Sequence, residues 1–262
     1  ILSIFVLADA IKRGVGMIVL FLGALGGVGA HLVKFAAAAG HAVTAVSRGK
    51  IEVPAGVRLV VADVAREGAL DEAVRGQDAV LSALGIRRAK QANPWSPLTS
   101  PPDFTSRTAR LLVEAMQKHG VRRVLAVSAS GVGDSRPGLN WMMRFFVRWT
   151  NVGANYRDLE RMEAVYAGSG LEWCCVRPTG LKDGPATRKV AVIGSFPFNA
   201  WISRADVAAW MVDHLADDLS ARRTPTITEA RELVVHERVH GVHEDGREPR
   251  PFARRALRRG VG

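Results

Sequence analysis

Short apolar runs alternate with longer stretches of helical patterning along most of the chain. The apolar runs predict buried strands at 17–22, 41–46, 57–61, 78–83, 122–127 and 171–176. Helical patterning covers 31–39, 67–75, 104–119, 141–163 with an interruption near 151–153, and 205–215. This alternation predicts an α/β fold with a doubly wound parallel sheet. In such a sheet, ligands bind at the carboxyl ends of the strands.

A glycine-rich turn follows the first predicted strand and opens a helix. Gly23 permits a tight turn, Gly26 lets the backbone approach a pyrophosphate, and Gly29 lets helix and strand pack closely. Free N–H groups at the helix N-terminus would then bind the phosphates. Glycines also mark ordinary turns. Here, however, the strand at 41–46 closes a βαβ unit, which predicts a Rossmann-type dinucleotide-binding domain.

The residue after the second strand bears on which dinucleotide binds. NAD-specific sites carry an acidic residue there, which holds the ribose 2′-hydroxyl. This chain has Arg48 instead. A guanidinium can hold a 2′-phosphate with two hydrogen bonds, whereas a carboxylate would repel it. The alternative interpretation of Arg48 is a solvated surface charge. We expect NADP(H) in preference to NAD(H).

Composition bounds the class of protein. The chain has 262 residues, 48% of them hydrophobic, which is enough for one α/β domain with a small substrate-covering segment at 179–203. Cys174 and Cys175 are adjacent in a predicted strand and would point to opposite faces, so a reducing cytoplasm fits better than a disulfide framework. No apolar run approaches the roughly 18 residues of a membrane span. We expect a cytoplasmic protein without a membrane partner.

The two ends of the chain differ from its middle. Met17 is the first methionine and begins the first strand, so we expect 1–16 to be an extension, 17–229 the NAD(P)-binding domain and 230–262 a basic tail. Six arginines and one glutamate between 247 and 262 account for much of the net charge of +11, and such a tail is more often disordered than nucleic-acid-binding. The chain carries no recognisable nucleic-acid-binding motif, so we expect no nucleic-acid partner. His236, His240 and His243 lie next to this tail and have no cysteine nearby, so we expect no metal site.

Further motifs follow in order along the chain, at 62–64, 76–80, 83–85, 127–130, 161–163, 169–173, 176–178, 183–185 and 202–207. Together with the glycine turn and Arg48, they resemble the atypical short-chain dehydrogenase/reductase families over about 17–229. The most similar group is the NAD(P)H-binding one that includes biliverdin-IXβ/flavin reductase and the NmrA-like proteins.

The resemblance implies a role for each residue at a predicted strand end. Residues that would wrap the pyrophosphate are Gly23, Leu25, Gly26, Gly27 and Val28, and Arg48 would bind the 2′-phosphate. Asp63 and Val64 would contact the adenine. The ribose would be lined by Ala83, Leu84 and Gly85, and the nicotinamide by Ser128, Pro178 and Thr179.

One feature departs from the wider superfamily, whose members use a Tyr-x-x-x-Lys pair in which lysine lowers the tyrosine pKa. Here Glu160 stands in the lysine position after Tyr156, and a carboxylate would raise that pKa. Tyr156 is therefore a candidate catalytic acid with packing or substrate contact as the alternative. Ser128 is a candidate to orient a carbonyl or the nicotinamide amide, although serines after strands often only cap a turn.

A site without an evident proton donor suits flat conjugated acceptors such as flavins or quinones. We therefore predict an NADP(H)-dependent oxidoreductase that transfers hydride to a small molecule of this kind. The alternatives are a non-catalytic NADP(H)-binding redox sensor of the NmrA-like kind and a sugar-nucleotide epimerase or dehydratase. Trp141, Phe145 and Trp149 form an aromatic stripe, which predicts packing in the core or in a homodimer, or a wall for a flat substrate.

Overall fold

The computed structural model describes residues 16–194, 199–218 and 223–230. The expected extension at 1–16 falls outside these residues except for its last one, and the basic tail falls outside them except for residue 230. His236, His240 and His243 also lie outside the described residues. Among the helices that are described, none is long and apolar enough to cross a membrane.

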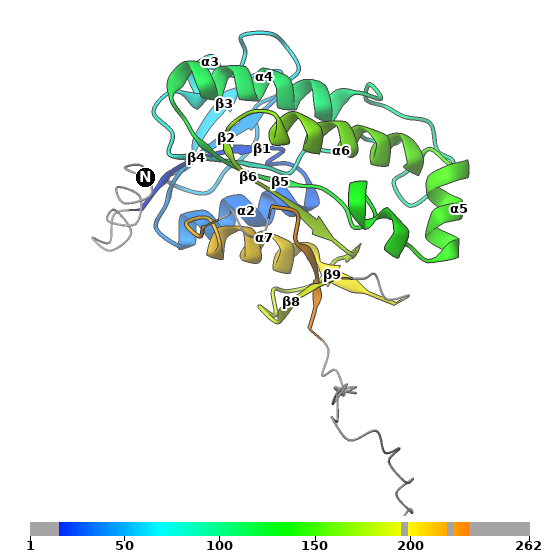
Figure 1. Ribbon diagram of the computed structural model, residues 1–262. Helices are drawn as coiled ribbons and strands as arrows, with labels where there is room; N and C mark the ends of the chain where they lie inside the picture. The colour runs from blue at the N-terminus through cyan, green and yellow to red at the C-terminus, as the bar shows by residue number, and fades with distance from the viewer. Residues whose placement is uncertain (1–15, 195–198, 219–222, 231–262) are drawn as a thin grey trace, which may run out of the picture. The chain divides into compact units, whose positions relative to one another are not determined.

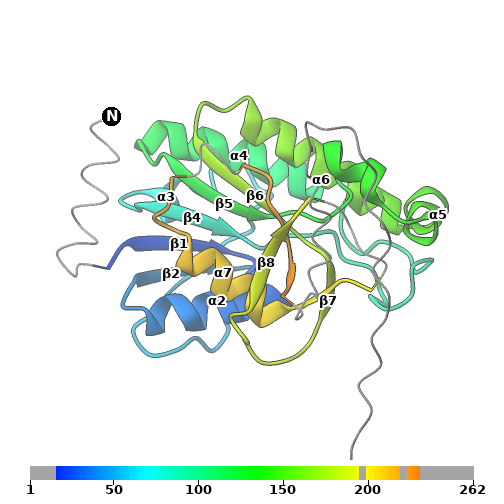
Figure 2. The ribbon, with the colours of Figure 1, turned by 60° about the horizontal axis from the view of Figure 1, so that its bottom comes forward.

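A mostly parallel sheet forms the centre of the described chain (Figures 1 and 2). Its strands, in spatial order, are β3 (Arg58–Val61), β2 (Ala42–Ser47), β1 (Ile18–Leu22), β4 (Ala79–Ser82), β5 (Arg123–Val127), β6 (Glu172–Pro178), β10 (Thr226–Glu229) and β8 (Val190–Ile193). All neighbours pair in parallel except β8, which is antiparallel to β10. The strand order reverses between β1 and β4, and ligands bind doubly wound sheets at such a reversal. The predicted fold class is therefore confirmed.

Helices cover both faces of the sheet. One face carries α2 (Gly27–Ala38) and α7 (Arg204–Asp213), and the other carries α3 (Asp71–Val74), α4 (Phe104–His119) and α6 (Val152–Ala167), as Figure 1 shows. The short helix α5 (Trp141–Trp149) follows a 3₁₀ turn, η1 (Gly133–Gly138), and packs against α6. Parallel strands joined by such helical crossovers are buried on both faces.

Alternation along the strands divides the core into two halves. Phe21 and Cys174 pack on the side of α2 and α7, whereas Leu22 and Cys175 pack on the side of α4 and α6. Both thiols are buried, and burial raises the pKa of the Cys174 thiol to about 12. The predicted placement of the two cysteines on opposite faces is confirmed.

Sequence patterns missed four short strands among the described residues and misplaced one helix. The predicted substrate-covering segment at 179–203 contains β8 and the two paired strands β7 (Gly180–Lys182) and β9 (Trp201–Ser203), and β10 follows it. These strands have three or four residues, too few for alternation to be recognised. The helix predicted at 67–75 contracts to α3, since Gly68 takes a φ of 72°.

The helical patterning predicted over 141–163 corresponds to two helices, α5 and α6. They meet at a sharp corner, as Figure 1 shows. A Cβ on Gly153 would lie 2.0 Å from the carbonyl oxygen of Val147, so the corner requires glycine there. The expected interruption near 151–153 is thus confirmed, and it turns the chain rather than merely bending one helix.

Candidate cofactor and substrate site

The turn between β1 and α2 is built so closely that its glycines cannot be replaced freely. Gly23 has a φ of 83°, and a Cβ on it would lie 2.8 Å from the Ala83 carbonyl oxygen. A Cβ on Gly29 would lie 2.0 Å from the Gly23 carbonyl oxygen. The first contact brings the turn against the end of β4, and the second seats α2 on the turn. The predicted roles of these two glycines in turning and packing match this geometry.

The N-terminus of α2 is open for a ligand. Its N-cap, Gly26, is extended and offers no side chain to the first-turn N–H groups, and that turn contains no acidic residue. A Cβ on Gly26 would lie 3.2 Å from the Gly23 carbonyl oxygen, and any larger side chain would fill the cradle. Unpaired N–H groups at a helix N-terminus bind anions. The turn therefore fits a dinucleotide pyrophosphate.

The other predicted contacts of the adenosine half follow neighbouring strands. Arg48 comes directly after β2, Asp63 and Val64 come two and three residues beyond β3, and 83–85 follow β4. Because β3, β2, β1 and β4 are adjacent and parallel, these residues gather at one edge. Arg48 is exposed and forms no ion pair with any residue in the described part of the chain. Asp63 is exposed too, whereas Val64 is buried.

A buried ion-pair network lies at the ends of β5 and β6. Ser128, just after β5, donates a hydrogen bond of 2.5 Å from Oγ to Glu163 Oε1 on α6. Arg177, within β6, donates to both oxygens of the same carboxylate, at 3.0 Å from Nε and 2.7 Å from Nη2. Glu163 and Arg177 are 7% and 4% exposed. Arg177 also pairs with Asp134 of η1.

These contacts set the charges and the direction of the Ser128 hydroxyl. Burial acts to lower the pKa of Arg177, but hydrogen bonds and attraction from Glu163 and Asp134 outweigh burial and raise that pKa. The hydrogen bond from Arg177 lowers the pKa of Asp134. With its proton directed to Glu163, Ser128 has only lone pairs to offer to a ligand, so it can accept a hydrogen bond there.

Glu163 and Arg177 fall within the sequence motifs at 161–163 and 176–178, but no role was predicted for either. The sequence signal for this pair is an arginine inside an apolar strand, because a buried charge needs a partner of opposite charge. Of the other two residues predicted at this end, Pro178 ends β6, and Thr179 donates its hydroxyl to Thr228 Oγ1 of β10 at 3.1 Å. The Thr179 hydroxyl thus bonds within the sheet.

Tyr156 is buried, and its hydroxyl is already hydrogen-bonded within the protein. Its side chain is 7% exposed, and its hydroxyl donates a hydrogen bond of 3.1 Å to the Ser130 carbonyl oxygen. Burial raises the pKa of Tyr156 to about 12. Glu160, in the lysine position, pairs instead with Arg136 at 2.8 Å. This arrangement favours the packing alternative over the acid.

The aromatic stripe of α5 does not enter the core. Trp141, Phe145 and Trp149 are 77%, 48% and 63% exposed, so the expectation of core packing was wrong. The helix is amphipathic but contacts the core through Met143 and Val147. Periodicity correctly identified the aromatic face of α5, but it is a different face of this helix that packs against α6. The substrate wall and the homodimer remain as predictions for this stripe.

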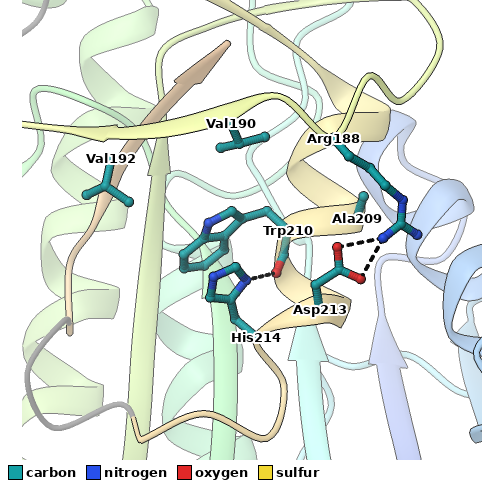
Figure 3. A pocket seen from close by; sticks show the side chains of 7 residues that line it. All are labelled: Arg188, Val190, Val192, Ala209, Trp210, Asp213 and His214. Atoms are coloured by element: carbon teal, nitrogen blue, oxygen red, sulfur yellow. Dashed lines mark hydrogen bonds and ion pairs between the residues drawn. The ribbon is translucent and has the colours of Figure 1, made fainter. Parts of the chain in front are cut away.

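A separate cavity of about 410 Å³ lies between β8 and the C-terminal part of α7 (Figure 3). Arg188 and Asp213 form an ion pair at 2.8 Å on one side, and the rings of Trp210 and His214 stack at 4.0 Å on the other. None of the residues predicted for cofactor or substrate lines this cavity. Nor do the described residues contain a group of three or more side chains that could hold a metal ion.

Comparison with known proteins supports the nucleotide site. A family model described as NAD(P)H-binding matches residues 23–218. Among solved structures, the anaerobilin reductase ChuY from Escherichia coli O157:H7 is 26% identical, with 80% of this chain and 96% of that chain covered and a TM-score of 0.62.

Two further structures, below 25% identity, show likeness of fold alone. A candidate NADH-flavin reductase from Streptococcus pneumoniae is 21% identical over 82% of this chain and all of that one, with a TM-score of 0.62. A candidate NAD-dependent epimerase/dehydratase from Bacillus halodurans is 23% identical over 82% of this chain and 95% of that one, with a TM-score of 0.65.

Proposed function

This chain belongs to the NAD(P)H-binding family, and we propose that it is an NADP(H)-dependent reductase of a flat conjugated small molecule. The family match and a solved neighbour that is a reductase support the general class. The preference for NADP(H) and the type of acceptor are our inferences from particular residues.

Cofactor selection is assigned to Arg48. It stands at the end of β2, exposed and without an ion pair among the described residues, next to the edge where the glycine turn opens. A guanidinium in that position can bind a 2′-phosphate through two parallel hydrogen bonds. Because NADH lacks this phosphate, Arg48 would contribute to NADPH affinity alone.

The reacting half of the site is assigned to the ends of β5 and β6. A bound nicotinamide cofactor would supply hydride there. Ser128, with its proton directed to Glu163, would accept a hydrogen bond from an amide N–H and so orient the ring that carries this amide. The bidentate contacts of Arg177 fix Glu163 and thereby the Ser128 hydroxyl.

We infer a flat conjugated acceptor mainly from the burial of the Tyr156 hydroxyl. It donates to Ser130 and has a pKa near 12, so it is poorly placed to protonate an isolated ketone. Flavins and quinones accept hydride into a conjugated ring and need less help from a protein acid. The same feature argues against a sugar-nucleotide epimerase or dehydratase.

The test is oxidation of NADPH, followed by absorbance, against a panel of flavins, quinones and small carbonyls. We expect turnover with a flat acceptor, and we expect Tyr156→Phe to retain it. Turnover with small carbonyls alone, lost in Tyr156→Phe, would contradict the proposal. Tight NADPH binding without turnover of any acceptor would support the redox sensor instead.

A further inference from the structure

An arginine with no role so far lies against the first turn of α2. Arg204 is the first residue of α7, and a Cβ on Gly27 would lie 2.5 Å from Arg204 Cδ and 2.9 Å from Arg204 Nε. Gly27 is the first residue of α2 and is exposed. The lack of a side chain at position 27 therefore lets the Arg204 stem extend beside the open helix N-terminus.

The local structure fixes where Arg204 begins. Ser203 caps α7 by accepting a hydrogen bond of 2.9 Å from the Asp206 N–H. The fully buried Asp206 carboxylate accepts from the N–H groups of Thr187 and Arg188, both at 2.7 Å. The start of α7 and the chain that precedes β8 are thus tied together, and α7 packs along α2.

The charged end of Arg204 has a replaceable partner. Its Nη1 lies 2.7 Å from Asp183 Oδ1, and the Asp183 side chain is 95% exposed. An ion pair with so exposed a carboxylate contributes little to stability and exchanges readily. The guanidinium can therefore leave Asp183 for a stronger anion without disturbing the fold.

We propose that Arg204 is the cation that binds the pyrophosphate of the cofactor, and that Asp183 holds its guanidinium beside the glycine turn until the cofactor binds. The inference rests on the proposed function. A guanidinium matches phosphate oxygens bidentately, and the helix N-terminus adds N–H donors and positive potential to the same anion. The doubly charged pyrophosphate competes well with one exposed carboxylate.

This role differs from that of Arg48 in a measurable way. NADH and NADPH share the pyrophosphate, so Arg204 contributes equally to both affinities, whereas Arg48 would distinguish them. The nucleotide 2′-AMP carries the phosphate assigned to Arg48 but no pyrophosphate. Its affinity should therefore not depend on Arg204.

Calorimetric titration of the full chain with NADPH, NADH and 2′-AMP tests the proposal. We expect Arg204→Gln, which keeps part of the stem, to weaken NADPH and NADH equally, by roughly tenfold or more, the size of one charged hydrogen bond. Binding of 2′-AMP should be unchanged. The matched control is Arg188→Gln, because Arg188 also pairs with a carboxylate, Asp213, but borders the separate cavity. It should leave all three affinities unchanged.

Two further variants test the mechanism. A methyl group in Gly27→Ala should displace the Arg204 stem, so this single substitution should weaken binding of NADPH and NADH alike. In the Arg204→Gln background, the same substitution should add little. Asp183→Asn should tighten NADPH binding by about threefold by removing the competing carboxylate, whose exposed ion pair is weak.

Unchanged NADPH affinity in Arg204→Gln, or an equal loss for 2′-AMP, would overturn the role of Arg204. If the wild-type chain still bound NADPH in that case, the proposed function would stand. A wild-type chain that bound neither NADPH nor NADH would overturn both.

Discussion

The two halves of the carboxyl edge of the sheet differ in which atoms line them, backbone atoms in one half and side chains in the other. At the ends of β1 and β4, backbone atoms form the candidate site. Gly23 and Gly29 allow the turn to pack closely, and Gly26 leaves the N-terminus of α2 uncovered. At the ends of β5 and β6, side chains form it, because Ser128, Glu163 and Arg177 make one buried network. The first half is suited to bind an invariant part of a ligand, and the second is suited to orient a reacting group.

Substitutions in the two halves should therefore affect different properties, ligand binding in the first and stability of the fold in the second. A side chain added to the backbone half blocks a ligand but leaves the core intact. A side chain removed from the network half leaves a buried charge with too few partners and so destabilises the fold.

The largest effect is expected in the backbone half. The backbone of Gly26 suits any residue, but valine there would fill the cradle before the first turn of α2. We expect Gly26→Val to weaken NADPH binding by roughly a hundredfold or more, through loss of several charged hydrogen bonds. Thermal unfolding should change little.

Gly168→Val is the matched control, since Gly168 lies at the end of α6 before the amino end of β6, and a Cβ on it would lie 3.6 Å from the Ala164 carbonyl oxygen, an ordinary contact. Its NADPH affinity, measured by the same titration, should remain close to that of the wild type. Unchanged affinity in Gly26→Val would remove the pyrophosphate from this turn.

In the network half, Glu163→Ala should destabilise the fold by roughly 3 kcal/mol, because it leaves the buried Arg177 with only the exposed Asp134 as an ion-pair partner. Glu160→Ala, on the same helix, removes only the exposed pair with Arg136 and should cost about 1 kcal/mol or less. Denaturant unfolding monitored by tryptophan fluorescence measures both. Equal losses would show that the network is not an energetic unit.

The smallest effect concerns the two tyrosines. Burial raises the pKa of Tyr156 to about 12 and that of Tyr166 still further above its usual value. The neutral phenols are therefore favoured by folding. This contribution to stability is present below pH 10 and is lost as pH rises toward about 12.

Phenolate absorbance measures this directly. At pH 10 the folded chain should show almost none, whereas the chain in denaturant should be about half ionised. A tyrosine of the folded protein that ionised near pH 7 would restore Tyr156 as a catalytic acid.

The sequence predicts the backbone half of the site better than the network half. The glycine turn is a local motif, so its glycines can be recognised within residues 23–29, and its N–H groups need no distant partner. Glu163 and Arg177 lie on different elements, and Ser128 is far from both in sequence, so only the packing of α6 on the sheet brings them together.

The outer elements show a second limit of sequence patterns. The spacing of Trp141, Phe145 and Trp149 identifies one apolar face of α5, but not whether anything covers it, because that depends on the corner at Gly153. In the same way, β8 and β10 join the sheet through pairing of short segments, which leaves little periodicity to detect.

We propose that this edge of the sheet binds NADP(H), with Arg48 recognising the 2′-phosphate. Titration of NADPH and NADH into the wild type and Arg48→Ala tests this role. We expect the wild type to prefer NADPH, and we expect Arg48→Ala to lose roughly tenfold or more in NADPH affinity, the size of one charged hydrogen bond, while NADH affinity is unchanged. Equal losses for the two cofactors, or none for either, would contradict it.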